Sequence, residues 1–294
     1  MNRGTDSRAP DARLRDLLAR RQAVAVPGTH DALGAMLIER AGFEAVYMSG
    51  YAVAASHGKP DIGLISVDDM VRHAREMAGA VSIPVLADAD TGYGGAANIL
   101  EAVQAFENAG VAGIHLEDQV APKKCGAMSG KALVSDDEMA ARLRAALRAR
   151  RSSDFLIIGR TDAMTLFGLE ESIRRLRKMA ETGIDAVMLT SLSSLDECKA
   201  VVDAVPIPVI HTVAEMLRPL HSQAELASTG LGMALYPITF VQATVGLQQR
   251  ILQTLAETGS TKSFEGDMAR LPDISRMLGV DRYAAFEADV VKGN

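Results

Sequence analysis

The segment over residues 117–131 places a cysteine among lysines and glycines, directly after an apolar run that ends in acidic residues. Lys123, Lys124 and Lys131 are expected to lower the pKa of the Cys125 thiol below its free value of about 8.5. The surrounding glycine and serine residues let a loop close over a ligand. A reactive thiol on a mobile loop is therefore one interpretation, and a solvated basic turn is the other.

A second chemical feature is a pair of carboxylates, Asp88 and Asp90, separated by one residue and followed by two glycines. In an extended chain both would leave the same face, and such oxygen donors suit Mg²⁺, which keeps several waters. Glu117 and Asp61 are expected to complete the outer coordination shell through water. The alternative is a capped turn in which Asp90 binds backbone amides.

Arg160 follows an apolar run at residues 155–159, and its planar guanidinium suits a carboxylate ligand. An ion pair with Asp162, or with an acid of a neighbouring strand, is the alternative. His115 lies within an apolar run, where a hydrogen-bonded core histidine is the expected role. Cys198 falls on a surface helix pattern, and we assign it no function.

Composition limits the classes of function that these residues can serve. The 294 residues are 48% hydrophobic, which allows one α/β barrel or two smaller domains. A net charge of −6 without a long basic run argues against a nucleic-acid partner. The two cysteines and the polar N-terminal residues predict a cytoplasmic protein. No apolar run reaches the roughly 18 residues of a membrane span, so no membrane association is expected.

Short apolar runs alternate with amphipathic segments along the chain, at the period of a βα unit. The runs lie at residues 23–26, 45–48, 84–87, 113–116, 155–159, 186–189, 208–210 and 231–235. The predicted helices lie at residues 12–20, 32–40, 67–78, 96–108, 136–149, 169–181 and 195–204. Their expected N-terminal caps are Ser66, Ser135 and Ser194, and their expected C-terminal glycines are Gly42, Gly110 and Gly183.

Eight such runs predict a (β/α)8 TIM barrel, with an open doubly wound sheet as the alternative. Active sites of these barrels lie at the C-terminal ends of the strands, where the polar residues described above gather. A long helix over 241–255 and two short helices follow, without a linker that would mark a domain boundary. Residues 1–294 are therefore predicted to form one barrel domain, with 239–294 as a helical extension.

Seven ordered segments, spread between residues 24 and 255, carry a family resemblance. They lie at residues 47–51, 60–63, 88–94, 114–119, 122–126, 159–163 and 233–237. Together they resemble the isocitrate lyase and phosphoenolpyruvate mutase superfamily, closest to its 2-methylisocitrate lyase and alkylmalate lyase branch. The resemblance implies a barrel whose eighth helix, in the 239–294 extension, is exchanged between subunits of a homotetramer.

The resemblance also implies roles for individual residues. Asp88 and Asp90 would hold Mg²⁺, or Mn²⁺ in its place. The 2-oxo acid carboxylate would bind Ser49, Gly50 and Tyr51. The remaining assignments are Cys125 and Gly126 in a gating loop, Arg160 at the second carboxylate, Thr190 and Thr212 in the substrate site, and Tyr47 as a candidate base.

The chemistry implied is a metal-dependent retro-aldol cleavage of a 2-hydroxy di- or tricarboxylic acid to pyruvate or glyoxylate, with Cys125 protonating the released carbanion. Four positions depart from isocitrate and methylisocitrate lyases: Ala127 replaces His, Thr190 Glu, Thr212 Asn and Gln242 Arg. A third carboxylate would lack its cation, so we expect a smaller malate-like acid, with or without an alkyl group. The alternatives are an oxaloacetate decarboxylase, a phosphonate-processing enzyme and a non-catalytic diacid-binding barrel.

Overall fold

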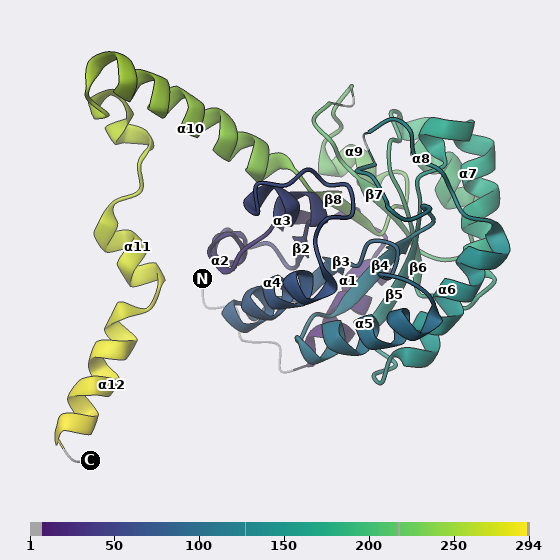
Figure 1. The fold of residues 1–294 in the computed structure, drawn as a ribbon, viewed down its shortest axis with the longest axis horizontal. Coiled ribbons are helices and arrows are strands. Elements are labelled where there is room, and N and C mark those ends of the chain that lie inside the picture. Colours follow the sequence, from purple (N-terminus) through teal and green to yellow (C-terminus); the bar gives the residue numbers. More distant parts are fainter. Residues whose placement is uncertain (1–7, 127, 217, 293–294) are drawn as a thin grey trace. The chain divides into compact units, whose positions relative to one another are not determined.

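The computed structural model of the chain describes residues 8–126, 128–216 and 218–292. Within these ranges, parallel strands β1 to β8 pair in sequence order, and β8 pairs with β1 to close a barrel (Figure 1). The strands are β1 (Val24–Thr29), β2 (Val46–Met48), β3 (Val85–Asp88), β4 (Gly113–Glu117), β5 (Leu156–Thr161), β6 (Ala186–Leu189), β7 (Val209–Thr212) and β8 (Met233–Tyr236). The predicted (β/α)8 barrel is confirmed.

Each strand is a short apolar run in the sequence because both faces of the sheet are covered. Alternate residues, such as Leu156 and Ile158 of β5, join the apolar cluster that fills the barrel interior. Leu14 of α1 (Pro10–Ala19) is fully buried in that same cluster, so α1 packs against the interior apolar core. A second, larger cluster lies between the strands and the outer helices.

The outer helices confirm most of the predicted ones. They are α2 (Ala32–Arg40), α4 (Val67–Ala80), α5 (Ala96–Asn108), α6 (Asp136–Ala149), α7 (Met164–Ala180) and α8 (Leu195–Ala204). The side chains of Ser66, Ser135 and Ser194 cap helix N-termini as predicted. Gly42, Gly110 and Gly183 have φ values near +90° after three helices, a conformation that favours glycine.

Two short helices were not predicted, because neither has enough residues to show a helical period. They are α3 (Gly50–Ser56), directly after β2, and α9 (Gln223–Ala227). The helix α7 begins five residues before its predicted start, and Gly168 at φ 80° interrupts it. Among the helices described, none is both long and apolar enough to cross a membrane.

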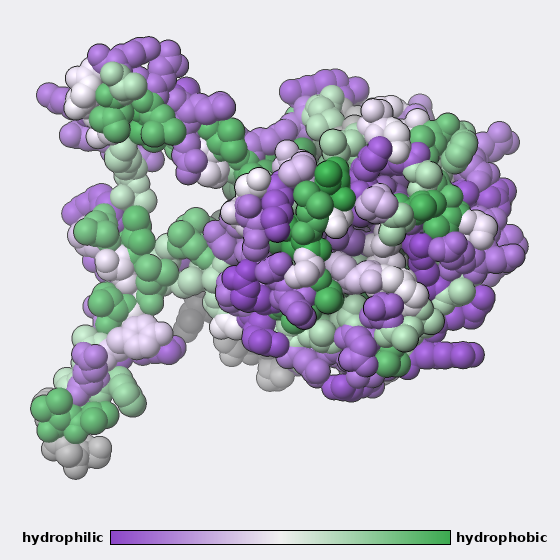
Figure 2. Space-filling view, viewed as in Figure 1, coloured by the Kyte–Doolittle hydropathy of each residue, from purple (hydrophilic) through white to green (hydrophobic). Residues whose placement is uncertain are grey.

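The chain divides into two compact units, residues 1–242 and 243–294. Beyond β8 the elements are α10 (Thr239–Thr258), the 3-10 helix η1 (Lys262–Asp267), α11 (Leu271–Met277) and α12 (Val280–Lys292). None of the residues described in α10, η1 or α11 is buried. Figure 2 shows apolar surface along this C-terminal unit. Its exposed large apolar side chains include Leu252, Leu271 and Phe286.

Candidate active site

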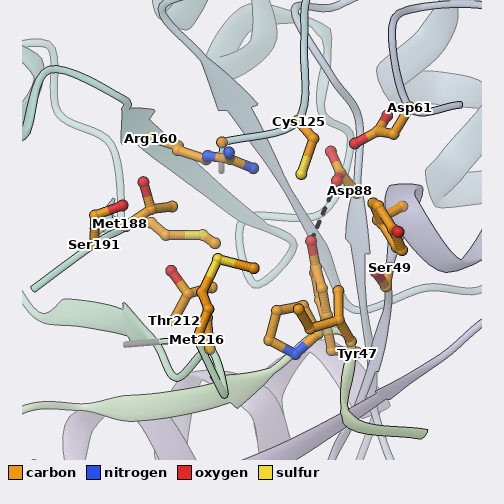
Figure 3. Close-up of a pocket in the computed structure, with 16 residues that line it drawn as sticks. Tyr47, Ser49, Asp61, Asp88, Cys125, Arg160, Met188, Ser191, Thr212 and Met216 are labelled. Atoms are coloured by element: carbon orange, nitrogen blue, oxygen red, sulfur yellow. Dashed lines mark hydrogen bonds between the residues drawn. The ribbon is translucent and has the colours of Figure 1, made fainter. Parts of the chain in front are cut away.

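A cavity of about 100 Å³ opens at the C-terminal ends of the strands. Because a single water needs about 10–15 Å³, this volume suits a small molecule rather than a polymer segment. The lining residues are Tyr47, Ser49, Tyr51, Asp61, Asp88, Cys125, Gly126, Arg160, Met188, Thr190, Ser191, Thr212, Ala214, Met216, Pro237 and Ile238. Figure 3 shows Cys125, Asp88 and Arg160 directed into one space.

Ten of the predicted site residues line this cavity. Gly50, Asp90 and Glu117 are buried beside it instead. Gly50 begins α3, and a Cβ added there would lie 2.7 Å from Asp88 Oδ2. The position therefore requires a residue without a side chain, so that the start of α3 can approach the carboxylate.

The carboxylates are arranged differently from the extended pair that we predicted. Asp90 has φ 48°, in the left-handed region, and its backbone N–H donates to Asp88 Oδ1 at 3.0 Å. Lys123 Nζ lies 2.5 Å from Asp61 Oδ1 and 2.7 Å from Asp90 Oδ1. A buried ammonium therefore bridges two of the four acids that were predicted to surround a metal ion.

These charges set the ionisation of the acids. Burial works to raise the pKa of Asp88, but the electrostatic interactions with the His115 ring and with the charged Lys123 and Arg160 lower it below its ordinary value. Burial also raises the pKa of Asp90 to about 6, because the attraction of Lys123 compensates only in part. Asp88 is therefore the carboxylate held most firmly in its charged form.

The donor set fits Mg²⁺. No group of three or more His, Cys, Asp or Glu side chains in the described residues is arranged to hold a metal by itself. Mg²⁺ requires only one or two carboxylates together with waters and substrate oxygens. Both carboxylate oxygens of Glu117 are buried and accept no hydrogen bond from the described residues, and burial raises the pKa of this group. Asp88 could therefore hold the ion, with Asp61, Asp90 and Glu117 reached through water.

Tyr47 connects the cavity to the barrel interior. Its hydroxyl lies 2.9 Å from His115 Nε2 and 3.3 Å from Asp88 Oδ2. Burial, followed by the charge of Asp88, raises the pKa of Tyr47 well above 10, so the phenol is protonated at neutral pH. Burial lowers the pKa of His115 to about 4, so this ring is neutral. Tyr47 can accept a proton only as it passes its own to Asp88 or His115.

Arg160 makes both of the ion pairs considered as alternatives to ligand binding. Its guanidinium lies 3.2 Å from Glu117 Oε2 and 3.0 Å from Asp162 Oδ1. The Thr190 hydroxyl and the Gln119 amide donate to Asp162 at 2.9 and 2.6 Å. Arg160 Nε is buried and donates to no group in the described residues, although the side chain lines the cavity. The two acids therefore fix the orientation of the guanidinium, and its Nε–H still lacks an acceptor among the described residues.

The loop that carries Cys125 is anchored through its backbone at Lys124 and Cys125. The Cys125 N–H donates to the Asp61 carbonyl at 2.9 Å, and the Gln119 amide binds both backbone groups of Lys124 at 2.8 Å. A Cβ added at Gly126 would lie 2.8 Å from Arg160 Nη2, so only glycine allows this approach.

The lysines of this loop contact acids and backbone carbonyls that were not predicted as their partners. Lys123 pairs with acids, as described above, whereas the ammonium of Lys124 donates to the Gly130 carbonyl and that of Lys131 to the Gly126 carbonyl. The lowered thiol pKa stays a prediction. The Ala127 substitution lies outside the described residues.

Known proteins resemble this chain in sequence and in fold. A family profile described as phosphoenolpyruvate phosphomutase matches residues 14–256. The chain belongs to this family. The predicted resemblance to the isocitrate lyase and phosphoenolpyruvate mutase superfamily is thereby confirmed.

Individual relatives of the phosphomutase family match over nearly the whole chain. The 2,3-dimethylmalate lyase of Eubacterium barkeri is 37% identical, covering 96% of this chain and 98% of its own. The 2-methylisocitrate lyase of Shewanella oneidensis is also 37% identical, covering 94% of each. A solved phosphonopyruvate hydrolase complex with oxalate and Mg²⁺ superposes with a TM-score of 0.86 at 29% identity, covering 96% of this chain and 99% of its own.

Sequence reasoning missed one wall of the cavity in this phosphomutase-family protein. Met188, Met216, Pro237 and Ile238 line it with apolar atoms, together with Ala214. In Figure 3, Met188 and Met216 lie across the cavity from Asp88. Met188 lies in β6, and the other four residues follow β7 or β8, a position that we searched only for polar side chains. Asp162 had been considered only as an ion-pair partner of Arg160, and Gln119, which donates to it, could have been found by the same rule of position.

Proposed function

We propose that this protein is a Mg²⁺-dependent carbon–carbon lyase that cleaves a malate-like 2-hydroxy dicarboxylic acid to a 2-oxo acid and a second carboxylate. The observation that carries the proposal is the two-sided cavity. Asp88, Cys125 and Arg160 face it from one side, and Met188 and Met216 from the other. The names of the relatives, among them 2,3-dimethylmalate lyase and 2-methylisocitrate lyase, support the reaction class.

Substrate binding follows from the placement of the donors. The first N–H groups of a helix have no acceptor within it, and those of α3 begin at Gly50, beside Asp88. Ser49, which caps α3, and Tyr51 line the cavity at the same end. We therefore assign the 2-oxo acid carboxylate to this end. The second carboxylate is assigned to Arg160, which Glu117 and Asp162 hold in position.

Mg²⁺, held by Asp88 and through water by the neighbouring acids, would supply a Lewis acid that favours ionisation of the substrate hydroxyl. Tyr47 takes the hydroxyl proton while its own proton passes to Nε2 of His115, 2.9 Å away, so that Asp88 stays ionised. The adjacent carbon–carbon bond then breaks, and its electron pair remains on the carbon of the departing carboxylate. Cys125 donates its thiol proton to that carbon, and solvent exchange returns each group to its starting protonation state.

The apolar wall supports a dicarboxylic substrate that carries an alkyl group. Within the part of the chain that the structure describes, Arg160 is the one cationic side chain that lines the cavity. A third carboxylate would lose its hydration without gaining a positive partner, which is costly. An alkyl substituent instead gains about 0.8 kcal/mol for each CH₂ buried against Met188 and Met216.

The Cys125→Ser variant tests the role of the thiol. Serine keeps the size of the side chain but is a far weaker acid, so turnover should fall by about 10²–10⁴ while diacid binding, measured by calorimetry, stays within a few fold. Cys198→Ser is the matched control, because Cys198 is buried on α8 and burial raises its pKa to about 11. A Cys125→Ser enzyme with undiminished turnover would contradict the proposed proton transfer.

We further propose that the protein assembles as a homotetramer in which the helical extension over residues 239–294 is exchanged between subunits. The argument is the exposed apolar surface of α10, α11 and α12, which a second chain could cover. Burying such side chains is favourable at about 25 cal/mol for each Å² removed from water.

A further inference from the structure

Outside the cavity, two histidines face each other where the end of α3 meets α4. His57 directly follows α3, and His73 lies on the buried face of α4. Their Nε2 atoms are 3.1 Å apart, whereas their ring centroids are 5.3 Å apart with the planes inclined by 55°. The two rings therefore turn their Nε2 edges toward a common point.

His73 is fixed in one orientation and one tautomer. Its Nδ1 lies 2.5 Å from the carbonyl oxygen of His30, in the segment between β1 and α2. Because a carbonyl oxygen only accepts hydrogen bonds, Nδ1 of His73 carries the proton. In the neutral ring, Nε2 then presents a lone pair to His57. Metal-binding histidines are oriented in this way, with the second ring nitrogen donating to a carbonyl or carboxylate.

We propose that His57 and His73 bind one divalent transition-metal ion through their Nε2 atoms. Two nitrogens about 2.0–2.1 Å from a tetrahedral zinc ion stand about 3.4 Å apart, so the pair needs to open by only a few tenths of an ångström. His57 shifts its proton to Nδ1 when the ion binds. Since His57 is only half-buried, water can fill the remaining coordination positions.

The type of ligand decides which metal the pair would take. Asp69 lies one turn before His73 on α4, but its carboxylate accepts from Ser66 Oγ at 2.8 Å and from Arg72 at 3.2 Å, so it is not a third ligand. Imidazole pairs select zinc, copper or nickel, whereas the carboxylates at the cavity suit Mg²⁺.

A metal ion here would join α3 to α4. The other end of α3 begins at Gly50, directly against Asp88 in the cavity. An ion that binds only the folded chain raises the free energy of unfolding by RT ln(1 + c/Kd), where c is the free ion concentration. The expected effect is therefore a higher melting temperature in the presence of zinc.

Zinc calorimetry on the full-length Cys125→Ser protein tests the site, with saturating Mg²⁺ present to occupy oxygen ligands and with the competing Cys125 thiol removed. We expect one saturable equivalent of Zn²⁺ and a rise in melting temperature. Adding His57→Gln, at a half-buried position that tolerates the change, should abolish both effects. Adding His221→Gln should leave both unchanged, because His221 lies in a different segment. Absence of a saturable equivalent, or its persistence after His57→Gln, would overturn the proposal.

Discussion

The Tyr47 hydroxyl lies 2.9 Å from Nε2 of His115, and both side chains are enclosed within the barrel. Nδ1 of His115 is also buried and has no hydrogen-bond partner in the described residues. In the relay, Nε2 of His115 is the ring nitrogen that accepts the phenol proton, and the ring becomes charged as it does so. Asp88 stays ionised, and its Oδ1, 3.6 Å from Nε2, favours the imidazolium that forms.

Replacing Tyr47 with Phe removes this relay while keeping the ring. We expect kcat to fall by at least about 100-fold with little change in KM, because proton transfer by a positioned group contributes about 10²–10⁴-fold. Steady-state kinetics on the best substrate measure both constants. Tyr93→Phe is the control, since the buried Tyr93 hydroxyl has no hydrogen-bond partner in the described residues. Equal losses in the two variants would show that the effect is structural.

The bridge from Lys123 to Asp61 and Asp90 links metal binding to stability. Lys123→Gln leaves two carboxylates without their cation, and breaking a buried pair costs about 3–5 kcal/mol. The loss in unfolding free energy should be smaller with Mg²⁺, because the divalent ion neutralises the same acids. Urea unfolding with and without Mg²⁺ measures the difference. Lys124→Gln, which removes one contact to a carbonyl at an exposed position, should change little. A Lys123→Gln loss independent of Mg²⁺ would count against the metal site.

Acid should destabilise the protein through its buried histidines. Burial lowers the pKa of His211 to about 4, whereas the unfolded chain takes up this proton below about 6.5. Between these values the unfolded state binds more protons, so the unfolding free energy decreases as the pH falls. The full loss is about 3.5 kcal/mol, from a pKa difference of about 2.5 at about 1.4 kcal/mol for each unit.

The raised pKa of Asp90, about 6, acts in the opposite direction below pH 6, so the contribution of His211 requires a difference measurement. Unfolding free energies of the wild type and His211→Gln should be compared between pH 7 and pH 4.5. We expect the wild type to lose more stability than the variant on acidification. Parallel curves for the two proteins would refute the assignment.

The exposed apolar side chains of the C-terminal unit predict an oligomer. Leu252, Leu271 and Phe286 are 63%, 74% and 69% exposed. Sedimentation equilibrium of the full chain should give the mass of a tetramer. Leu252→Asp together with Phe286→Asp should shift the mass toward smaller species, whereas Lys199→Asp on α8 should not. A monomeric wild-type chain would exclude the exchanged extension.

Sequence periodicity predicted the barrel well because a buried parallel strand is uniformly apolar and each outer helix has one apolar stripe. The strand β6 and the helix α6 match their predicted ranges fully. The predictions failed for short helices, which contain too few residues to show a helical period of apolar side chains. The helix α3 has seven residues, and its start beside Asp88 depends on Gly50 having no side chain.

Strand order was enough to predict which polar residues gather at the cavity, but it could not assign their partners. The expected effect of Lys123 on Cys125 stays a prediction, but the pairing of Lys123 with Asp61 and Asp90 was not foreseen. Such pairings depend on loop paths in three dimensions, as in the left-handed turn at Asp90. The apolar wall could not be predicted for a similar reason. In the sequence, a methionine that lines the cavity cannot be distinguished from a methionine of the core.

The central claim is tested most directly by 2-oxo acid release from citramalate, 2,3-dimethylmalate, methylisocitrate, isocitrate and oxaloacetate, with and without Mg²⁺. Oxaloacetate is followed by its disappearance. We predict Mg²⁺-dependent release from citramalate or 2,3-dimethylmalate, with a kcat/KM above that for methylisocitrate and isocitrate. Turnover of oxaloacetate alone, or comparable cleavage of the tricarboxylic acids, would contradict the account.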